Sequence, residues 1–328
     1  MSKESHLERT AKEPRDVSLH RVIIREIDEI NDSIRVFRLE TPDDGMIKFL
    51  PGQWLDVYVP TVAQAGGFTI TSPPSAASPP SDSKKYAYLE LAIQKSPSNP
   101  PAAWLWQQPP SSILQSVLHV RVGGAFVYPP FPLKPEPIRK VIFLAGGVGI
   151  NPLTSMLSSI ADLNNKNNTP EVHFFYSVKN PPSDVEGPFD SKRIHFLDRI
   201  AGLFSPFPCP DGCAAPASVK GKFKLFLTSG TGTGPTPTTP PDEKKETIPC
   251  CNGRVQTPFL RRRITKQDVA SALGLGLGDG DGDDQEGTYV YVCGVPSMTD
   301  QFVRELTSPV ETGGLGMEAD RVLFEKWW

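Results

Sequence analysis

Residues 141–153 decide the fold and read Val-Ile-Phe-Leu-Ala-Gly-Gly-Val-Gly-Ile-Asn-Pro-Leu. The apolar, partly β-branched run at their start is typical of a strand that is buried on both faces in a parallel sheet. Three glycines follow, where the backbone can turn tightly and leave room for a ligand. Pro152 suits the first turn of a helix with an apolar face over residues 153–160. This order of elements predicts a phosphate site, because free N–H groups and the positive end of the helix dipole meet there.

The glycine spacing alone is a weak indication. It differs from the G-x-G-x-x-G dinucleotide fingerprint, since Pro152 stands where the last glycine would be. A glycine turn between a strand and a helix can also be purely structural. A second unit of the same kind strengthens the functional interpretation, because residues 289–298 again pass from an apolar run through a short loop to a helix start.

Six segments form a set that keeps its order through nearly the whole chain. They are residues 6–11 (His-Leu-Glu-Arg-Thr-Ala), 51–54 (Pro-Gly-Gln-Trp), 66–70 (Gly-Gly-Phe-Thr-Ile), 145–152, 293–298 and 324–328 (Phe-Glu-Lys-Trp-Trp). The set resembles the ferredoxin–NADP reductase superfamily of flavin-dependent NAD(P)H oxidoreductases, and within it the oxidoreductase NAD-binding domain-containing protein 1 group. The resemblance implies an N-terminal antiparallel flavin-binding β-barrel followed by a Rossmann-like parallel-sheet NAD(P)-binding domain.

The length of the chain allows two domains, each with its own core. The chain has 328 residues and a net charge of -3, with Lys and Arg scattered, so no nucleic-acid partner is expected. No apolar run is long enough for a transmembrane segment. The N-terminus resembles neither a secretory signal nor a transit peptide, and five cysteines without a signal indicate a reducing, intracellular compartment. The resemblance implies a mitochondrial placement, with the cytoplasm left open.

The spacing of apolar residues predicts the architecture of the N-terminal part of the chain. After an N-terminal extension, residues 1–17, short alternating runs separated by turn residues predict an antiparallel barrel over 18–135. One short helix is expected near residues 102–106. The expected strands cover residues 22–27, 33–39, 54–59, 67–72, 86–94 and 118–122.

Residues 136–328 change to a pattern of alternating strands and helices, which predicts a parallel sheet with covering helices. Strands are expected at residues 141–145, 172–177, 223–228 and 289–293, with helices beginning near 152, 193, 265 and 297. Two segments of low complexity, at about 206–250 and 274–287, are interpreted as flexible surface insertions.

No metal site is predicted in these insertions. Cys209, Cys213, Cys250 and Cys251 bracket the first, but adjacent cysteines rarely both reach one tetrahedral zinc ion. We interpret them as ordinary thiols in a mobile loop. The acidic run at 279–284 lacks the glycine and the spaced glutamate of a calcium loop.

The resemblance places the flavin on residues 66–72. Phe68, Thr69 and Ile70 would bind the cofactor, and Ser72 would contact its ring as a catalytic residue. A plain half-buried strand is the alternative. The superfamily's arginine for the flavin phosphate is replaced by Gly66, and its tyrosine by Phe68.

A buried phosphate needs other donors once the arginine is absent. The helix start near residues 99–103, with Ala102 and Ala103, is the candidate, although the usual glycine and serine are missing there. The cofactor is therefore expected to be FAD, with FMN, weak binding or loss of the flavin left open.

For NAD(P)H, the resemblance places the pyrophosphate on the glycine loop and the nicotinamide near the second loop. Lys179 would meet a 2′-phosphate or be solvated surface, so NADH against NADPH stays open. The implied cofactor-binding residues are Gly146, Gly147, Val148, Gly149, Asn151, Pro152, Gly294, Pro296 and Met298.

Three further residues are catalytic candidates from the resemblance. Cys293 would border the site of hydride transfer, or be a structural cysteine. Glu325 would relay protons, and Trp328 would stack on the flavin, or pack in the core. The hypothesis is a flavin-dependent NAD(P)H oxidoreductase that passes electrons to another molecule, since no iron–sulfur or haem motif is present. The alternative is an NAD(P)-binding or scaffolding protein that has lost efficient flavin chemistry.

Overall fold

The computed structural model describes residues 5–41, 46–78, 86–132, 136–163, 169–179, 190–205, 219–228, 246–275 and 285–326. The chain divides into two compact units. The first comprises Met1–Leu133 and Asn151–Ser159, and the second comprises Lys134–Ile150 and Ile160–Trp328. The sequence-based boundary near residue 135 lies close to this division.

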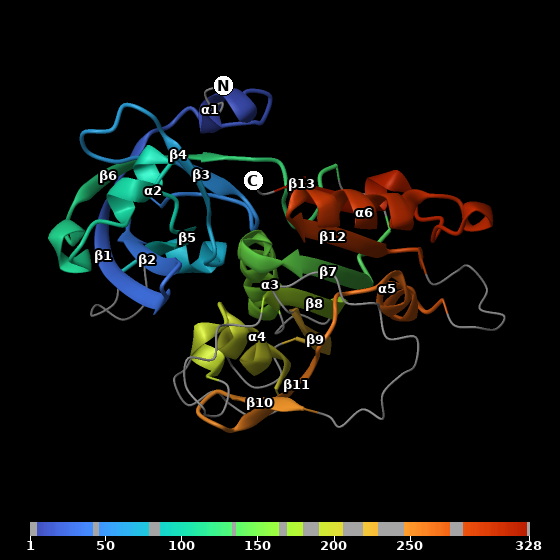
Figure 1. Cartoon of the computed structure of the whole chain (residues 1–328). Helices are drawn as coiled ribbons and strands as arrows, with labels where there is room; N and C mark the ends of the chain where they lie inside the picture. Colours follow the sequence, from blue (N-terminus) through green and yellow to red (C-terminus); the bar gives the residue numbers. More distant parts are fainter. Residues whose placement is uncertain are drawn as a thin grey trace. The chain divides into compact units, whose positions relative to one another are not determined.

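The first unit is built on six antiparallel strands in the order β4-β3-β6-β1-β2-β5 (Figure 1). A bridge between Ile70 and Leu91 joins the two edge strands, so the sheet closes on itself as a barrel. The strands are β1 (His20–Asn31), β2 (Ile34–Glu40), β3 (Trp54–Tyr58), β4 (Gly66–Thr69), β5 (Tyr88–Gln94) and β6 (Val117–Gly123). The antiparallel barrel predicted from the sequence is confirmed.

The barrel closes around side chains that alternate along each strand. In β6, Leu118, Val120 and Val122 are buried, whereas His119 between them is exposed. The helix expected near residues 102–106 is α2 (Pro100–Leu105), whose Ala102 and Leu105 complete the same core. The remaining short elements are α1 (His6–Arg9) and the 3₁₀ turns η1 (Pro74–Ala77) and η2 (Pro110–Ile113).

The second unit is a seven-stranded sheet in the order β10-β11-β9-β8-β7-β12-β13. All its pairs are parallel except β10 with β11, so the predicted Rossmann-like architecture is confirmed. The strands are β7 (Lys140–Gly146), β8 (Glu171–Lys179), β9 (Gly221–Thr228), β10 (Thr247–Cys250), β11 (Val255–Leu260), β12 (Thr288–Gly294) and β13 (Val322–Lys326). The helices are α3 (Ile150–Asp162), α4 (Leu197–Phe204), α5 (Lys266–Leu273) and α6 (Pro296–Thr307).

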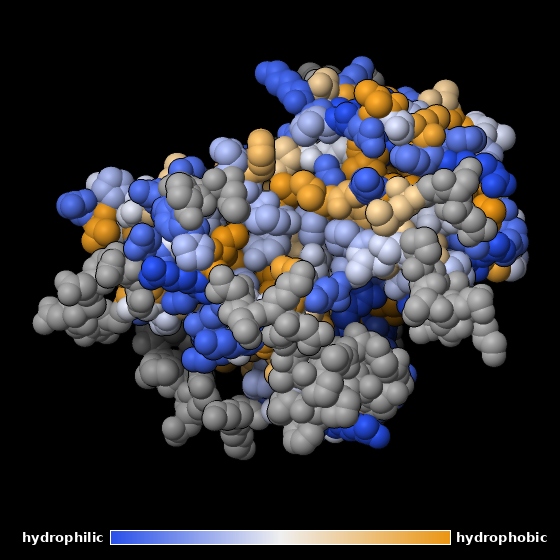
Figure 2. All heavy atoms as spheres, turned by 180° about the vertical axis from the view of Figure 1, so that it is seen from behind, coloured by the Kyte–Doolittle hydropathy of each residue, from blue (hydrophilic) through white to orange (hydrophobic). Residues whose placement is uncertain are grey.

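Strands β7 and β12 are adjacent interior strands of this sheet. Every residue of β12 is buried, and β7 is buried from Val141 to Ala145, as the apolar runs predict for strands covered on both faces. None of the helices in the described ranges has both the length and the apolar character needed to cross a membrane. On the face shown in Figure 2, apolar side chains occur in several separate groups between hydrophilic ones.

The structure adds three strands that the sequence pattern did not predict: β10, β11 and β13. Strands β10 and β11 each contain a proline, Pro249 and Pro258, and the antiparallel β10 is the edge of the sheet, where a missing N–H is tolerated. Strands β9 and β10 both fall within 206–250, the range interpreted as an insertion. Of the second insertion, residues 276–284 lie outside the described part, as does the acidic run once compared with a calcium loop.

The N-terminal segment is fixed to the barrel through the buried carboxylate of Asp56. His6 Nε2 lies 3.0 Å from Asp56 Oδ1, while Arg15 Nε and Arg121 Nη2 donate to Oδ2 at 3.0 and 2.7 Å. The His6 ring fills the space that a side chain at Gly67 would occupy. Burial raises the pKa of Asp56, but hydrogen bonds from His6, Arg121 and Arg15 outweigh it and hold the pKa below its usual value.

Replacing Asp56 by asparagine should destabilise the barrel and change its response to acid. A depressed folded-state pKa gives stability that is present above the unfolded pKa of about 3.9 and is lost as the pH falls through the folded value. We expect Asp56→Asn to lower the free energy of unfolding by about 2–3 kcal/mol at neutral pH, because the partly buried guanidinium groups of Arg15 and Arg121 lose their buried counter-charge. Denaturant melts between pH 3 and 7 measure this, with the pH dependence below pH 4 reduced.

The exposed Asp28→Asn variant of β1 is the matched control and should behave as the wild type. Equal losses in the two variants would show that Asp56 is not the anchor.

Candidate functional site

The glycine loop after β7 has two differently constrained glycines. Residues Gly147–Gly149 form a 3₁₀ turn that runs directly into α3. Gly147 has φ +54°, and a Cβ added there would meet no atom within 4 Å. Gly149 is the opposite case, since a Cβ there would collide with the backbone carbonyl of Cys293. One glycine thus leaves the loop open and the other allows it to pack closely.

The second loop, between β12 and α6, meets the first through a methionine. A Cβ at Gly146 would lie 2.5 Å from Met298 Sδ, and one at Gly294 would lie 3.1 Å from the same sulfur. Pro296 is the first residue of α6, where a missing N–H costs nothing. The structure therefore brings together five predicted site residues at the carboxyl ends of adjacent parallel strands, the edge where α/β sheets bind ligands. They are Gly146, Gly149, Cys293, Gly294 and Met298.

Strand β13 adds a carboxylate to this edge. Glu325 is paired in register with Cys293 across the parallel strands, and Ala145 of β7 is the partner of Cys293 on its other side. Glu325 is half-buried and Cys293 is fully buried. The next residue, Lys326, pairs with Asp300 of α6 at 2.6 Å, which fixes the end of β13. Trp328, the predicted stacking residue, lies outside the described residues.

Alanine at Gly149 should mainly reduce stability, whereas alanine at Gly147 should mainly reduce nucleotide affinity. Gly149→Ala forces β12 away from the loop and should cost about 3 kcal/mol of unfolding free energy. Gly147→Ala should cost only about 1 kcal/mol, for the left-handed backbone, yet weaken nucleotide binding about tenfold because its methyl enters the open space. Thermal unfolding and calorimetric titration with NADH and NADPH measure the two effects. Unchanged nucleotide affinity in Gly147→Ala would remove Gly147 from the binding loop.

The predicted flavin segment lies on β4 and the residues after it. Phe68 and Ile70 are in the barrel core, and the hydroxyl of Ser72 accepts a hydrogen bond from the backbone N–H of Glu90 at 3.1 Å. Thr69 differs, since its side chain is 1% exposed and its hydroxyl has no hydrogen-bond partner among the described residues. A buried hydroxyl without a partner is costly, which makes Thr69 the residue here that a ligand atom would satisfy.

The start of α2 does not fit a diphosphate. Pro100 and Pro101 have no N–H, and Asn99 accepts the next one, from Ala102, at 3.3 Å through its side chain. The N–H of Ala103 donates to the carbonyl of Asn99 at 2.8 Å. The first turn thus has no free donor, and the suggestion that Ala102 and Ala103 receive the flavin phosphate is not supported by this geometry.

Two residues of α3 have roles that the sequence did not indicate. The amide of Asn151, predicted to bind the nucleotide, donates to the carbonyl of Ala92 at 3.0 Å. The hydroxyl of Ser155 donates to the carbonyl of Ser72 at 2.7 Å. Both contacts lie within the first unit, where they connect α3 to the predicted flavin segment. Pro152 is the third residue of α3 and, with Asn151, belongs to that unit. Val148 is half-buried in the glycine turn.

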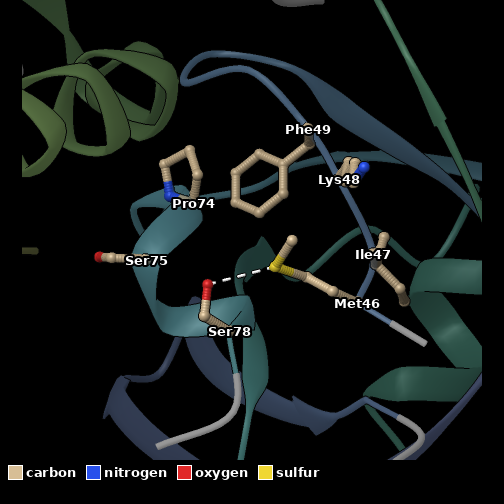
Figure 3. Close-up of a pocket in the computed structure, with 7 residues that line it drawn as sticks. All are labelled: Met46, Ile47, Lys48, Phe49, Pro74, Ser75 and Ser78. Atoms are coloured by element: carbon tan, nitrogen blue, oxygen red, sulfur yellow. Dashed lines mark hydrogen bonds between the residues drawn. The ribbon is translucent and has the colours of Figure 1, made fainter. Parts of the chain in front are cut away.

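A pocket of about 220 Å³ lies beside η1, shortly after Ser72 in the chain. The side chains of Met46, Phe49 and Pro74 point toward one another, and the hydroxyl of Ser78 donates to Met46 Sδ at 3.2 Å (Figure 3). None of the predicted cofactor residues lines this pocket, so it gives no support to the flavin assignment.

The described cysteines of the first predicted insertion are structural. Cys250 ends β10 and accepts a hydrogen bond from Thr257 at 3.2 Å, and the thiol of Cys251 donates to the carbonyl of Asp198 at 3.3 Å. Burial raises the pKa of Cys250 to about 12, which disfavours the thiolate that zinc requires. Both thiols are buried beside β10 and β11, so the mobile-loop interpretation is wrong for this pair, whereas Cys209 and Cys213 lie outside the described residues. The described residues contain no cluster able to hold a metal ion.

Removing the unpartnered hydroxyl of Thr69 should stabilise the protein. Thr69→Val replaces it by a methyl group of similar size, and we expect the free energy of unfolding to rise by about 1 kcal/mol. Thr71→Val is the matched control, because the hydroxyl of Thr71 donates to Glu90 Oε1 at 2.8 Å and its loss should be destabilising. Denaturant unfolding of both variants measures this. A loss of stability in Thr69→Val would mean that its hydroxyl has a partner.

Comparison with known proteins agrees with this architecture. No family model matches the chain. The oxidoreductase NAD-binding domain-containing protein 1 of Danio rerio is 30% identical over 330 residues, which cover 98% of this chain and 97% of the relative. The chain belongs to this family. Its resemblance to the ferredoxin–NADP reductase superfamily is confirmed at the level of the fold by solved structures.

Two of these structures are a ferredoxin NADP⁺ reductase from Neisseria gonorrhoeae, with bound FAD and NADP, and phthalate dioxygenase reductase. The first has a TM-score of 0.55 and 15% identity, covering 95% of this chain and 100% of its own. The second has a TM-score of 0.51 and 16% identity, covering 94% of this chain and 68% of its own. At these identities the likeness shows the fold alone.

Proposed function

We propose that this member of the oxidoreductase NAD-binding domain-containing protein 1 family is an NAD(P)H oxidoreductase that passes hydride from the nicotinamide to a flavin. The observation that carries the proposal is the meeting of two glycine loops at the carboxyl ends of β7 and β12, with Cys293 and Glu325 paired on neighbouring strands. A site that only binds a dinucleotide requires no more than the first loop. A carboxylate and a thiol at the same edge suit a reaction at the nicotinamide end.

The residues of the second unit have distinct tasks in this proposal. Gly147 gives the pyrophosphate access to the backbone at the start of α3, while Gly149 holds the loop against Cys293. Cys293 and Gly294 border the nicotinamide, and Met298 fixes the second loop by filling the space left by two glycines. Glu325 holds or releases a proton at the same edge. A flavin, when bound, supplies a ring that accepts the hydride.

The onward acceptor is proposed to be a separate molecule. The phthalate dioxygenase reductase is described as a modular structure for electron transfer from pyridine nucleotides to [2Fe-2S]. This chain shows no cysteine motif for such a cluster, so electrons would leave to a small molecule or a protein. A mitochondrial location is proposed from the family resemblance.

A binding or scaffolding role is the second candidate, and the first turn of α2 favours it. FAD binding through that turn would lack N–H donors, because two of its residues are prolines and the next N–H is taken by Asn99. The two functions differ in one observable. An oxidoreductase oxidises NADH or NADPH when a flavin is present, whereas a binding protein shows nucleotide affinity without turnover.

The test is anaerobic oxidation of NADH and NADPH by the purified full chain, with riboflavin, FMN or FAD added in turn. We expect bleaching of the flavin absorbance by one nucleotide faster than by the other. Glu325→Gln should slow the turnover about a hundredfold while nucleotide affinity stays constant, because one proton-transfer group is lost. The exposed Glu311→Gln variant is the matched control. Nucleotide binding without reduction of any flavin would favour the scaffolding role.

A further inference from the structure

Among its described residues, the barrel has a polar group suited to the ring of a flavin but none suited to its phosphates. A flavin consists of a tricyclic ring, a ribityl chain and, in FMN and FAD, one phosphate or a diphosphate joined to AMP. A resident FAD needs charge and N–H donors for the diphosphate, because a buried phosphate without partners is strongly disfavoured. The first unit offers neither at the predicted position.

The seam between β4 and α2 is closed by apolar side chains. A Cβ at Gly66 would lie 2.6 Å from Cε2 of Phe68 and 2.8 Å from Cβ of Pro101. The Phe68 ring and Pro101 therefore occupy the space where a side chain at position 66 would project. Neither a cationic side chain there nor a phosphate in its place fits without moving both rings.

The buried and partly buried arginines of the first unit do not compensate for this. Every described arginine of the barrel strands that is at least partly buried forms an ion pair with a carboxylate, and so does Arg15 of the N-terminal segment. Using any of them for phosphate would take one partner away from a carboxylate that is already paired. The pairs are Arg15 and Arg121 with Asp56, Arg25 with Glu40, Arg35 with Glu29, and Arg38 with Glu26.

For the flavin ring, by contrast, the barrel has a hydrogen-bonding group in Thr69. Thr69 carries a hydroxyl that is buried without a partner among the described residues, directly after Phe68 on β4. A hydroxyl both donates and accepts, so it suits the alternating carbonyl and nitrogen edge of a flavin ring. Because the Thr69 side chain is only 1% exposed, a ring that reaches it must displace the groups that cover it. Such displacement lowers affinity and favours release.

We infer that the flavin is a diffusible substrate that the barrel recognises by its ring, and that its phosphates contribute little to binding. The inference rests on the proposed function and specifies its second substrate. In each turnover the nicotinamide gives up a hydride, and the oxidised flavin takes that hydride and one proton that Glu325 relays from solvent. The products are NAD(P)⁺ and a two-electron-reduced flavin, which leaves the protein and reduces the next acceptor.

The experiment compares riboflavin, FMN and FAD by flavin-fluorescence titration and by the KM of each in NAD(P)H oxidation, using the full chain. We expect the three Kd values to lie within about threefold of one another and the FMN value to be insensitive to salt, because no charge pair forms. Protein that purifies with stoichiometric FAD, or that prefers FAD over riboflavin tenfold or more, would overturn the inference. If no flavin is bound or reduced, the proposed function fails as well.

Two variants separate ring recognition from phosphate recognition. Thr69→Val should raise the Kd of all three flavins by the same factor, about fivefold to tenfold, while its melting temperature rises and its nucleotide affinity is unchanged. The double variant Pro100→Gly, Pro101→Ser restores two N–H groups and should lower the Kd of FMN and FAD about fivefold relative to that of riboflavin. An effect of Thr69→Val confined to FAD would contradict ring recognition. The Thr69→Val titration decides the matter even where the double variant does not fold.

Discussion

The second unit depends on a contact that leaves no room for a Cβ atom. The loop after β7 lies against the end of β12, so closely that Gly149 faces the carbonyl of Cys293 and Gly146 faces the sulfur of Met298. Interiors at this packing density transmit small changes in volume directly. The same contact sets the start of α3 and the position of Cys293, so the geometry of the proposed nucleotide site and the pairing of β7 with β12 are one constraint.

The sequence predicted the elements with a strong period and missed those without one. The runs that became β7, β8 and β12 are apolar enough to identify buried parallel strands, and the alternation over residues 33–39 identified the barrel strand β2. Strands β10 and β11 were not predicted because they contain prolines. Strand β13 was not predicted because five residues are too few to show a clear alternation of apolar and polar side chains. Their place is fixed by pairing with neighbouring strands, which a single sequence does not contain.

The candidate site also contains residues that the sequence identified and residues whose roles only the structure shows. The glycines of the two loops were identified from the order of strand, loop and helix and from the family resemblance. The structure places Gly146 and Gly294 against Met298, and Gly149 against the backbone of Cys293. The roles of Asn151 and Ser155 depend on carbonyl groups far away in the chain, so residue type alone does not reveal them. The prolines at the start of α2 were visible, but their effect appears only once Asn99 is seen to take the next N–H.

The His6 ring occupies the volume of a side chain that residue 67 lacks. Two positions far apart in the chain therefore share one space, which either can fill but not both. Evolution is then expected to treat them as a pair: lineages that acquire a side chain at 67 should lose the imidazole at 6 and leave Asp56 paired with Arg15 and Arg121 alone. The Gly-Gly-Phe form of the flavin segment and the N-terminal histidine would be inherited together as a single trait of the family.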